Sequence, residues 1–289
     1  MRWQGRKKST NIEDRRRGGG AVRTGAGVSI GAIVIYLLVT LLGGDGSQVL
    51  SQLGQDGAST TAPAPGGTAQ GGEDELAEFV SVVLKDTEDI WDVLFREQLQ
   101  RSYDEPVLVL FSQQVQSRCG TASSATGPFY CPGDEKLYID LSFYQELKNR
   151  FRAPGDFAMA FVVAHEVAHH VQQELGIMNE VHAQRSRLSQ AQNNELSVRL
   201  ELQADFLAGV WAHHTHKMKG VLEEGDIEEA IRVTEAIGDD AIQMQSQGYV
   251  VPESFTHGSS EQRKRWFAKG LRSGDLRQGD TFAIPASQL

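Results

Sequence analysis

Apolar residues recur at helical spacing through most of the chain after residue 73. In the segment 73–99, apolar residues from Leu76 to Ile90 lie three, four or seven positions apart, which predicts a long amphipathic helix. The segment 156–175 is apolar on almost every side until its middle and is followed by Gly176, so it predicts a buried helix that ends at a glycine. The same kind of pattern predicts further helices over 142–151, 189–217, 226–238 and 259–271.

Two short runs predict strands. Residues 106–111, PVLVLF, are continuously apolar after their proline, as in a buried strand. Residues 136–141, KLYIDL, alternate apolar side chains with a tyrosine and an aspartate, as in a half-exposed strand. Because the strands cluster before the central helices, we predict an α+β fold that is mostly helical with a small antiparallel-type sheet.

The first 72 residues differ in composition from the rest. Residues 1–24 carry eight Lys/Arg against two acidic residues, 25–44 carry no charge, and 45–72 are rich in Gly, Ser, Ala, Gln, Thr and Pro. An uncharged run of about 20 residues is long enough to cross a bilayer core as a helix, and a basic flank marks the cytoplasmic side. We therefore predict a cytoplasmic head (1–24), a single transmembrane helix (25–44), a flexible linker (45–72) and an extracytoplasmic domain (73–289) in the cell membrane. The alternatives are a cleaved signal peptide, or a soluble enzyme in which 25–44 is a buried helix.

Charge limits the partners of the folded part. The formal net charge is −10, and since the basic residues are concentrated in the head, the remainder is more acidic still. An acidic body repels phosphates, which argues against nucleic-acid binding. The expected partners are a peptide or protein substrate, and the lipid bilayer through residues 25–44.

The chain has two cysteines, Cys119 and Cys131, with eleven residues between them. This spacing fits neither a zinc knuckle nor a Cys-x-x-Cys redox motif. A disulfide between them is permitted if the domain lies outside the cytoplasm, and two free buried thiols are the alternative.

A metal-binding pattern interrupts the apolar helix at 156–175. His165 and His169 are four residues apart, so their imidazoles lie on one helix face, with Glu166 beside them. Two histidines at this spacing can hold one zinc ion, and the glutamate can reach the water at its open position. Burying a Glu or His side chain without a partner destabilises a fold by roughly several kcal/mol, and a metal ion supplies that partner.

A third zinc ligand is expected from the helix at 189–217. Glu201 and Asp205 share one face of it and lie among apolar residues, so we predict Glu201 as the ligand and Asp205 as the group that orients a ligand histidine. Glu195 is the rival ligand, but its neighbours are polar. The alternative for Glu201 and Asp205 is a salt bridge with Arg199 or Arg187.

The other histidines carry weaker predictions. His170 points about 100° away from His169, so an ordinary hydrogen bond is expected for it. A second metal could bind at His213, His214 and His216, although side chains at a helix end are usually solvated. His257 lies in a glycine-flanked loop from which it could stabilise the oxyanion of a tetrahedral intermediate, or it is a plain turn residue.

Together these residues resemble the neutral zinc metallopeptidases of bacteria, a membrane-anchored branch of the zincin-like peptidases. The resemblance rests on several long motifs in the same order, at 1–20, 119–147, 161–172, 196–214 and 256–275.

The resemblance implies a zincin-like domain with one zinc ion held by His165, His169 and Glu201. It also implies a catalytic role for Glu166 and a hydrogen bond from His165 to Asp205. The family often has glycine where Ala168 stands and cysteine where Phe206 stands, and neither position is a ligand.

We therefore expect a membrane-anchored zinc metallopeptidase that hydrolyses peptide bonds through a zinc-activated water, with Glu166 as general base and His257 at the oxyanion. The strand at 136–141 is expected to pair with an extended peptide, and the Cys119–Cys131 loop to fix the chain that enters this strand. The alternative is a catalytically silent, zinc-stabilised envelope module that binds a partner.

Overall fold

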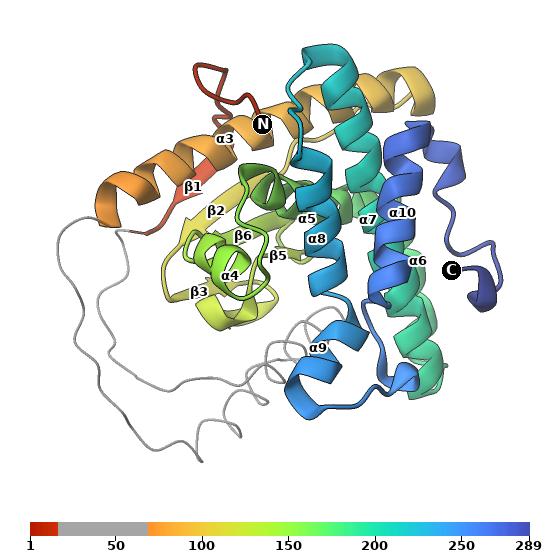
Figure 1. The fold of residues 1–289 in the computed structure, drawn as a ribbon. Coiled ribbons are helices and arrows are strands. Elements are labelled where there is room, and N and C mark those ends of the chain that lie inside the picture. Colours follow the sequence, from red (N-terminus) through yellow and green to blue (C-terminus); the bar gives the residue numbers. More distant parts are fainter. Residues whose placement is uncertain (17–68) are drawn as a thin grey trace, which may run out of the picture.

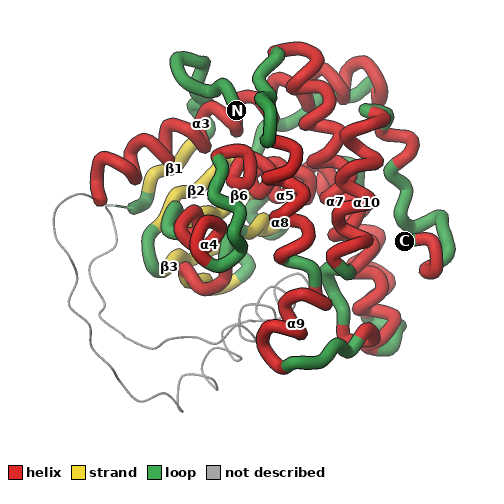
Figure 2. Tube along the Cα trace, viewed as in Figure 1, coloured by secondary structure: helices red, strands yellow, loops and turns green. Residues whose placement is uncertain are grey.

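The computed structural model describes residues 1–16 and 69–289 of the chain (Figure 1). In these residues the helices outnumber the strands, and the strands gather beside the helical part (Figure 2). The predicted α+β class, mostly helical with a small sheet, is therefore confirmed. No helix in the two described ranges has the length and apolar character needed to cross a bilayer. The transmembrane helix predicted at 25–44 lies outside the described residues, so it stays a prediction.

The main sheet has the strand order β1-β2-β6-β5 across the described residues. These strands are β1 (Ile12–Asp14), β2 (Val107–Phe111), β6 (Lys136–Asp140) and β5 (Phe129–Cys131). Two pairs, β1–β2 and β2–β6, are parallel, and the pair β5–β6 is antiparallel. The sheet is therefore mixed, and the predicted antiparallel-type sheet is wrong. Strand β1 comes from the N-terminal head. The hairpin and β5 lie between β2 and β6 in the chain and turn it back, so that β6 runs parallel to β2.

Strand β6 is an interior strand. It pairs with β2 on one side and β5 on the other, and Tyr138 and Asp140 are only 1% and 7% exposed. The prediction that this strand is half-exposed is wrong, because both polar side chains are buried and each has a partner. The Tyr138 ring stacks on Phe129 with ring centroids 4.8 Å apart, and the Asp140 carboxylate accepts a hydrogen bond from the backbone N–H of Gln113 at 2.9 Å.

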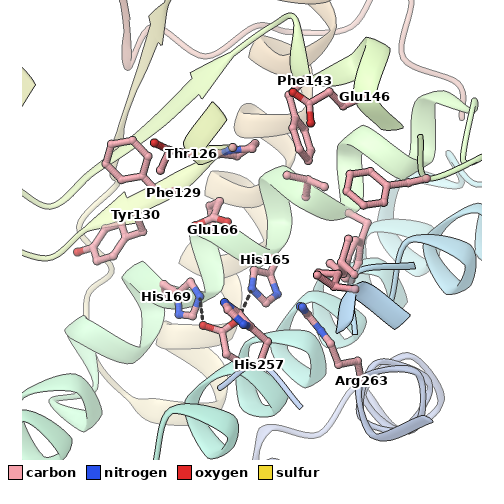
Figure 3. A pocket seen from close by; sticks show the side chains of 18 of the residues that line it. Thr126, Phe129, Tyr130, Phe143, Glu146, His165, Glu166, His169, His257 and Arg263 are labelled. Carbon is pink, nitrogen blue, oxygen red and sulfur yellow. Dashed lines mark hydrogen bonds and ion pairs between the residues drawn. The ribbon is translucent and has the colours of Figure 1, made fainter. Parts of the chain in front are cut away.

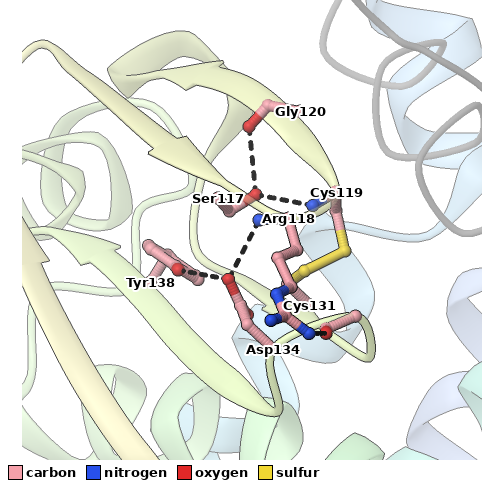
Figure 4. The surroundings of a disulfide bond; sticks show 8 residues. Ser117, Arg118, Cys119, Gly120, Cys131, Asp134 and Tyr138 are labelled. Carbon is pink, nitrogen blue, oxygen red and sulfur yellow. Dashed lines mark hydrogen bonds between the residues drawn. A yellow bond between two sulfur atoms is a disulfide. The ribbon is translucent and has the colours of Figure 1, made fainter.

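A small hairpin of β3 (Gln114–Ser117) and β4 (Gly120–Ser123) is joined to the main sheet by a disulfide (Figure 4). Cys119 lies in the hairpin turn and Cys131 ends β5, with their Cα atoms 5.8 Å apart. The hydroxyl of Ser117 accepts a hydrogen bond from the Cys119 N–H at 3.1 Å. The structure thus contains the disulfide that the sequence allowed, and the bond fixes the hairpin to the end of β5.

The helices of the described residues follow the predicted order with two additions. Their bounds are α3 (Ala69–Leu94), α4 (Phe143–Asn149), α5 (Asp156–Glu174), α6 (Ile177–Arg185), α7 (Gln190–Lys219), α8 (Asp226–Ala236), α9 (Asp239–Gln247) and α10 (Ser260–Ser273). Helix α3 begins within the stretch predicted as linker, four residues before the predicted boundary at Glu73. Helices α6 and α9 were not predicted, because both are short and largely polar.

Helix α5 is the centre of the core. Every residue from Phe157 to Gln172 is buried, and Gly176, with φ of 80°, follows the helix in the left-handed region. Helix α7 packs against α5, and α10 packs against α7 with the two backbones in contact at Gly209 and Gly270. A Cβ atom on Gly270 would lie 2.0 Å from the carbonyl oxygen of Phe206. This close crossing brings α10 side chains to the buried face of α7.

Candidate metal centre

Helix α5 places three chemically active side chains in the interior. His165, Glu166 and His169 are 7%, 8% and 5% exposed. The i, i+4 spacing predicted from the sequence puts both imidazoles on the face of α5 that meets α7, since α5 and α7 pack side by side. An apolar helix can carry these groups inside only when each of them has a partner.

Glu201 on α7 provides that partner for both histidines. One carboxylate oxygen, Oε2, lies 3.2 Å from His165 Nε2, and the other, Oε1, lies 3.5 Å from His169 Nε2. Burial would raise the pKa of Glu201, but the adjacent His169 and His165 outweigh burial and lower it. Glu201 is therefore held as a carboxylate between two imidazoles.

The opposite ring nitrogens fix the orientation of both histidines. His165 Nδ1 lies 2.9 Å from Asp205 Oδ1, and His169 Nδ1 lies 2.9 Å from Gln172 Oε1. Both partners are acceptors, so each Nδ1 donates to its partner and each Nε2 is the ring nitrogen left facing Glu201. The side chain of Gln172 is held in turn, because its amide donates to the Leu200 carbonyl at 2.8 Å.

This arrangement fits zinc. The ligand atoms of His165, His169 and Glu201 all lie within 4.8 Å of one another. Tetrahedral zinc with bonds of about 2.0–2.1 Å separates its ligands by about 3.3 Å, close to the two nitrogen–oxygen distances above. When both imidazoles are neutral, their Nε2 lone pairs and the Glu201 carboxylate converge on one point, an arrangement that a cation stabilises. Two imidazoles and one carboxylate are a ligand set of catalytic zinc sites.

Asp205 is the centre of a second buried interaction, with Arg263 on α10. Arg263 donates to both Asp205 oxygens, from Nε at 2.8 Å and from a terminal nitrogen at 2.9 Å. Burial would raise the pKa of Asp205, but Arg263 and the hydrogen bond from His165 outweigh it and lower the pKa. Asp205, a fully buried carboxylate whose charge is offset by Arg263, thus holds His165, as the sequence predicted. The part played by Arg263 was not predicted.

Glu166 faces the pocket beside the histidines and is not one of the three converging ligands (Figure 3). Burial raises the pKa of its carboxyl, and the neighbouring His169 and His165 oppose that rise only in part. A carboxylate with a raised pKa holds a proton more readily than an exposed one, which suits a group that accepts a proton and returns it.

His257 lines the same pocket, from the loop before α10 (Figure 3). Its Nδ1 lies 3.2 Å from Asp239 Oδ1, while Asp239 Oδ2 accepts backbone N–H groups from Thr256 and His257 at 2.6 and 2.7 Å. Burial would lower the pKa of His257, but Asp239 outweighs burial and raises it. The structure therefore brings His257 to the site with Nε2 free of these contacts, and Asp239 shapes the loop that carries it.

The remaining candidates lie outside the metal centre. Exposed Glu195 pairs with Arg199 at 2.7 Å, so Glu201 and Asp205 do not depend on Arg199 for partners. His170 contacts the Asp104 carbonyl through Nε2 at 2.7 Å and the Tyr130 hydroxyl through Nδ1 at 3.2 Å. At the end of α7, His213 and His214 contact backbone carbonyls of the α10 end, at Leu271 and Gly274.

Three residues of the centre escaped sequence reasoning: Arg263, Gln172 and Asp239. Gln172 had a local signal, since it lies three residues after His169 on the same helix. The other two had none, because only the crossing of α10 over α7 and the position of α9 bring them to the site.

Comparisons with known proteins agree with this geometry. The model of a family described as "putative neutral zinc metallopeptidase" matches residues 1–282. "Uncharacterized protein YpfJ" of Escherichia coli K12 is 46% identical over 291 residues, which cover 98% of this chain and 99% of that protein. "Uncharacterized protein Rv2575" of Mycobacterium tuberculosis H37Rv is 40% identical over 253 residues, 84% of each chain. No solved structure matches. Since the family model spans nearly the whole sequence and the match to YpfJ extends end to end, the chain belongs to this zinc metallopeptidase family.

Proposed function

We propose that the protein is a zinc-dependent peptidase that hydrolyses peptide bonds in peptide or protein substrates. The observation that carries the proposal is the convergence of His165, His169 and Glu201 from two helices, with Glu166 beside them in the same pocket. A purely structural zinc site usually closes all four positions with protein ligands and needs no base. Here three residues converge and a non-ligating carboxylate faces the pocket.

The roles of the side chains follow from their contacts. When bound, zinc would polarise the scissile carbonyl and make the attacking water more acidic. Glu166 would take a proton from that water and pass it to the leaving amine. His257, held by Asp239 through Nδ1 at 3.2 Å, would donate from Nε2 to the oxygen that becomes negative. Asp205 and Gln172 would keep the two imidazoles in the orientation that leaves Nε2 free.

A substrate chain would pair with β5. The prediction that the strand at 136–141 receives the peptide is wrong, since β6 is already paired along both edges. β5 is the edge strand of the main sheet next to the pocket, and Phe129 and Tyr130 line that pocket. An extended peptide added to a sheet edge gains main-chain hydrogen bonds, and the Cys119–Cys131 disulfide holds the end of β5 in place.

The test is the conservative variant Glu166→Gln in the full chain. Zinc content, measured by elemental analysis, is expected to match the wild type, because Glu166 is not one of the three converging ligands. Hydrolysis of an unfolded protein is expected to vanish, as it should in wild type treated with a chelator. Glu195→Gln, an exposed glutamate on α7, is the matched control and should keep full activity.

Two outcomes would contradict the proposal. Hydrolysis that survives in Glu166→Gln would remove Glu166 from its role as general base. Zinc-loaded wild type that cleaves no peptide would favour the alternative, a catalytically silent module that binds a partner through the same pocket.

A further inference from the structure

An apolar hollow adjoins the metal-binding residues on the N-terminal side of the motif in α5 (Figure 3). Six apolar side chains line it, and they come from α4 and the loop after it, from α5, from the C-terminal end of α8 and from α9. They are Phe143, Phe151, Phe161, Val162, Ile237 and Ile242. Glu146 and Arg150 also line the pocket, but their charges lie 3.6 Å apart and offset each other.

The hollow lies within one helical turn of the reacting groups. Phe161 precedes His165 by four residues and Val162 precedes Glu166 by four, so the lining starts about 5–6 Å from the chemistry. An extended peptide advances about 3.3 Å per residue, so a side chain in this hollow belongs to a residue that flanks the cleaved bond.

The size and chemistry of the hollow select a side chain. The whole pocket, which includes the space at the metal-binding residues, has a volume of about 160 Å³, so the hollow is smaller than the cavities of about 150 Å³ that hold a benzene ring or at most similar to them. Its walls would desolvate a charged side chain without pairing it, which is unfavourable. We propose that the pocket binds a large apolar side chain (Leu, Ile, Met or Phe) next to the scissile bond, so that it determines cleavage specificity. This rests on the proposed peptidase function.

Peptide libraries randomised at each position and cleaved by the full chain test the proposal. A preference of tenfold or more for large apolar over small or charged residues is expected at one position flanking the cleaved bond. Ile242→Trp should fill the hollow and shift that preference toward Gly and Ala. Met244→Trp, on the same helix but with its side chain 54% exposed, is the matched control and should leave the preference unchanged.

Binding separates this inference from the peptidase proposal. Zinc-loaded protein should bind a peptide hydroxamate with a leucine side chain at least tenfold more tightly than its glycine counterpart, whether or not it cleaves peptides. Equal affinities, or a cleavage profile that Ile242→Trp leaves unchanged, would overturn the pocket assignment and leave the peptidase function standing. Absent cleavage with the affinity difference intact would overturn the peptidase function alone.

An independent observation concerns the first sixteen residues, which are built into the domain (Figure 1). Strand β1 pairs in parallel with β2, with Ile12 opposite Leu108. Trp3 contacts Phe79 of α3, with ring centroids 5.4 Å apart. Arg6 forms two hydrogen bonds to the buried carboxylate of Asp86, at 2.7 and 2.6 Å.

Further contacts join polar groups of the head to charged groups of the body. The buried carboxylate of Glu88 accepts hydrogen bonds from the Ser9 hydroxyl at 2.5 Å and from the Asn11 side chain at 3.0 Å. Lys136 of β6 forms an ion pair with Glu13 of β1. The head is therefore complementary in shape and charge to the surface of the body against which it packs.

This packing constrains membrane topology. Paired strands lie about 4.8 Å apart, whereas a bilayer core is about 30 Å thick. A chain that crosses a membrane once at 25–44 puts residues 1–16 and 69–289 on opposite sides, where β1 and β2 cannot pair. We infer that residues 1–16 and 69–289 lie on the same side of any membrane that the protein contacts.

Cysteine labelling in intact cells tests the inference. Lys7→Cys in the head and Met218→Cys on α7 place thiols at exposed positions, and the native cysteines are already joined in a disulfide. A membrane-impermeant maleimide should label both positions or neither in intact cells, and both after permeabilisation. Labelling of one position with protection of the other would overturn the inference and support a single crossing.

Discussion

The contact between α7 and α10 predicts that replacing a helical glycine by alanine destabilises the protein, the opposite of what helix propensity predicts. Replacing glycine by alanine inside a helix normally stabilises a protein by up to about 1 kcal/mol. In Gly270→Ala, however, the new methyl group would lie 2.0 Å from the carbonyl oxygen of Phe206 and 2.9 Å from the backbone nitrogen of Val210. Backbone atoms cannot rotate away as a side chain does, so the two helices must move apart.

The cost is set by that movement. Carbon and oxygen atoms in contact need more than 3 Å, so α10 must shift from α7 by roughly 1 Å, and overpacking of this kind costs about 1–3 kcal/mol or more. After subtraction of the propensity gain, we expect the free energy of unfolding to fall by about 2 kcal/mol. For a domain of this size that corresponds to a loss of about 4–8 °C in Tm. The shift would also strain the Arg263–Asp205 hydrogen bonds and so weaken zinc binding.

Thermal unfolding followed by circular dichroism measures the effect. Gly72→Ala is the matched control, because Gly72 lies in α3 and a Cβ there meets no atom within 4 Å. That substitution should raise Tm slightly or leave it unchanged. A Gly270→Ala protein as stable as Gly72→Ala would refute the idea that backbone contact at this crossing holds the two helices together.

Three further predictions concern single side chains. Asp205→Asn should weaken zinc binding about 10–100-fold, since the partner of His165 Nδ1 loses its charge. Competition with a chelator measures the zinc affinity, and an unchanged affinity would contradict the role of Asp205. His257→Gln should lower kcat about 100–1,000-fold with zinc content unchanged, and an equal loss of zinc would instead make it a ligand. The hydrogen bond from Lys136 lowers the pKa of Glu13 below its ordinary 4.5. The Glu13 carboxylate therefore stabilises the packing of the head above pH 4.5, and this stabilisation is lost as the pH falls through the lowered pKa of Glu13. Hydrogen exchange of the β1 amides should therefore speed up in acid relative to a Glu13→Gln control, and identical pH profiles would contradict this.

Local rules explain which features of this protein the sequence predicts. His165 and His169 share a face because any α-helix brings i and i+4 together, whatever surrounds it. Glu201 was identifiable because an acidic residue within an apolar helix needs a partner. The helices themselves were predictable from apolar spacing, as for α5 and α7, which follow the predicted ranges closely.

Pairings between distant segments were not predictable in this way. The strand at 136–141 has an alternating pattern typical of a half-exposed strand, yet β6 is buried between β2 and β5, which pair along its two edges. The basic head was interpreted from its charge and from the uncharged run that follows it. Its partners, Asp86 and Glu88, are about 80 residues away, and nothing in either segment alone indicates the pairing.

Charge balance shows why the metal centre requires α10 as well as the motif. Glu201 and Asp205 are both buried carboxylates on one face of α7, and two unpaired buried charges would cost many kcal/mol, on the order of several for each ion. Arg263 offsets Asp205, which can then accept the hydrogen of His165 and leave Nε2 available. Glu201 faces the imidazoles of His169 and His165, which lower the pKa of its carboxyl, and a zinc ion at the three converging ligands would offset its charge further. The helix crossing at Gly270 therefore supports the candidate metal site, because it brings Arg263 to Asp205 and so lets two acids occupy the same buried face.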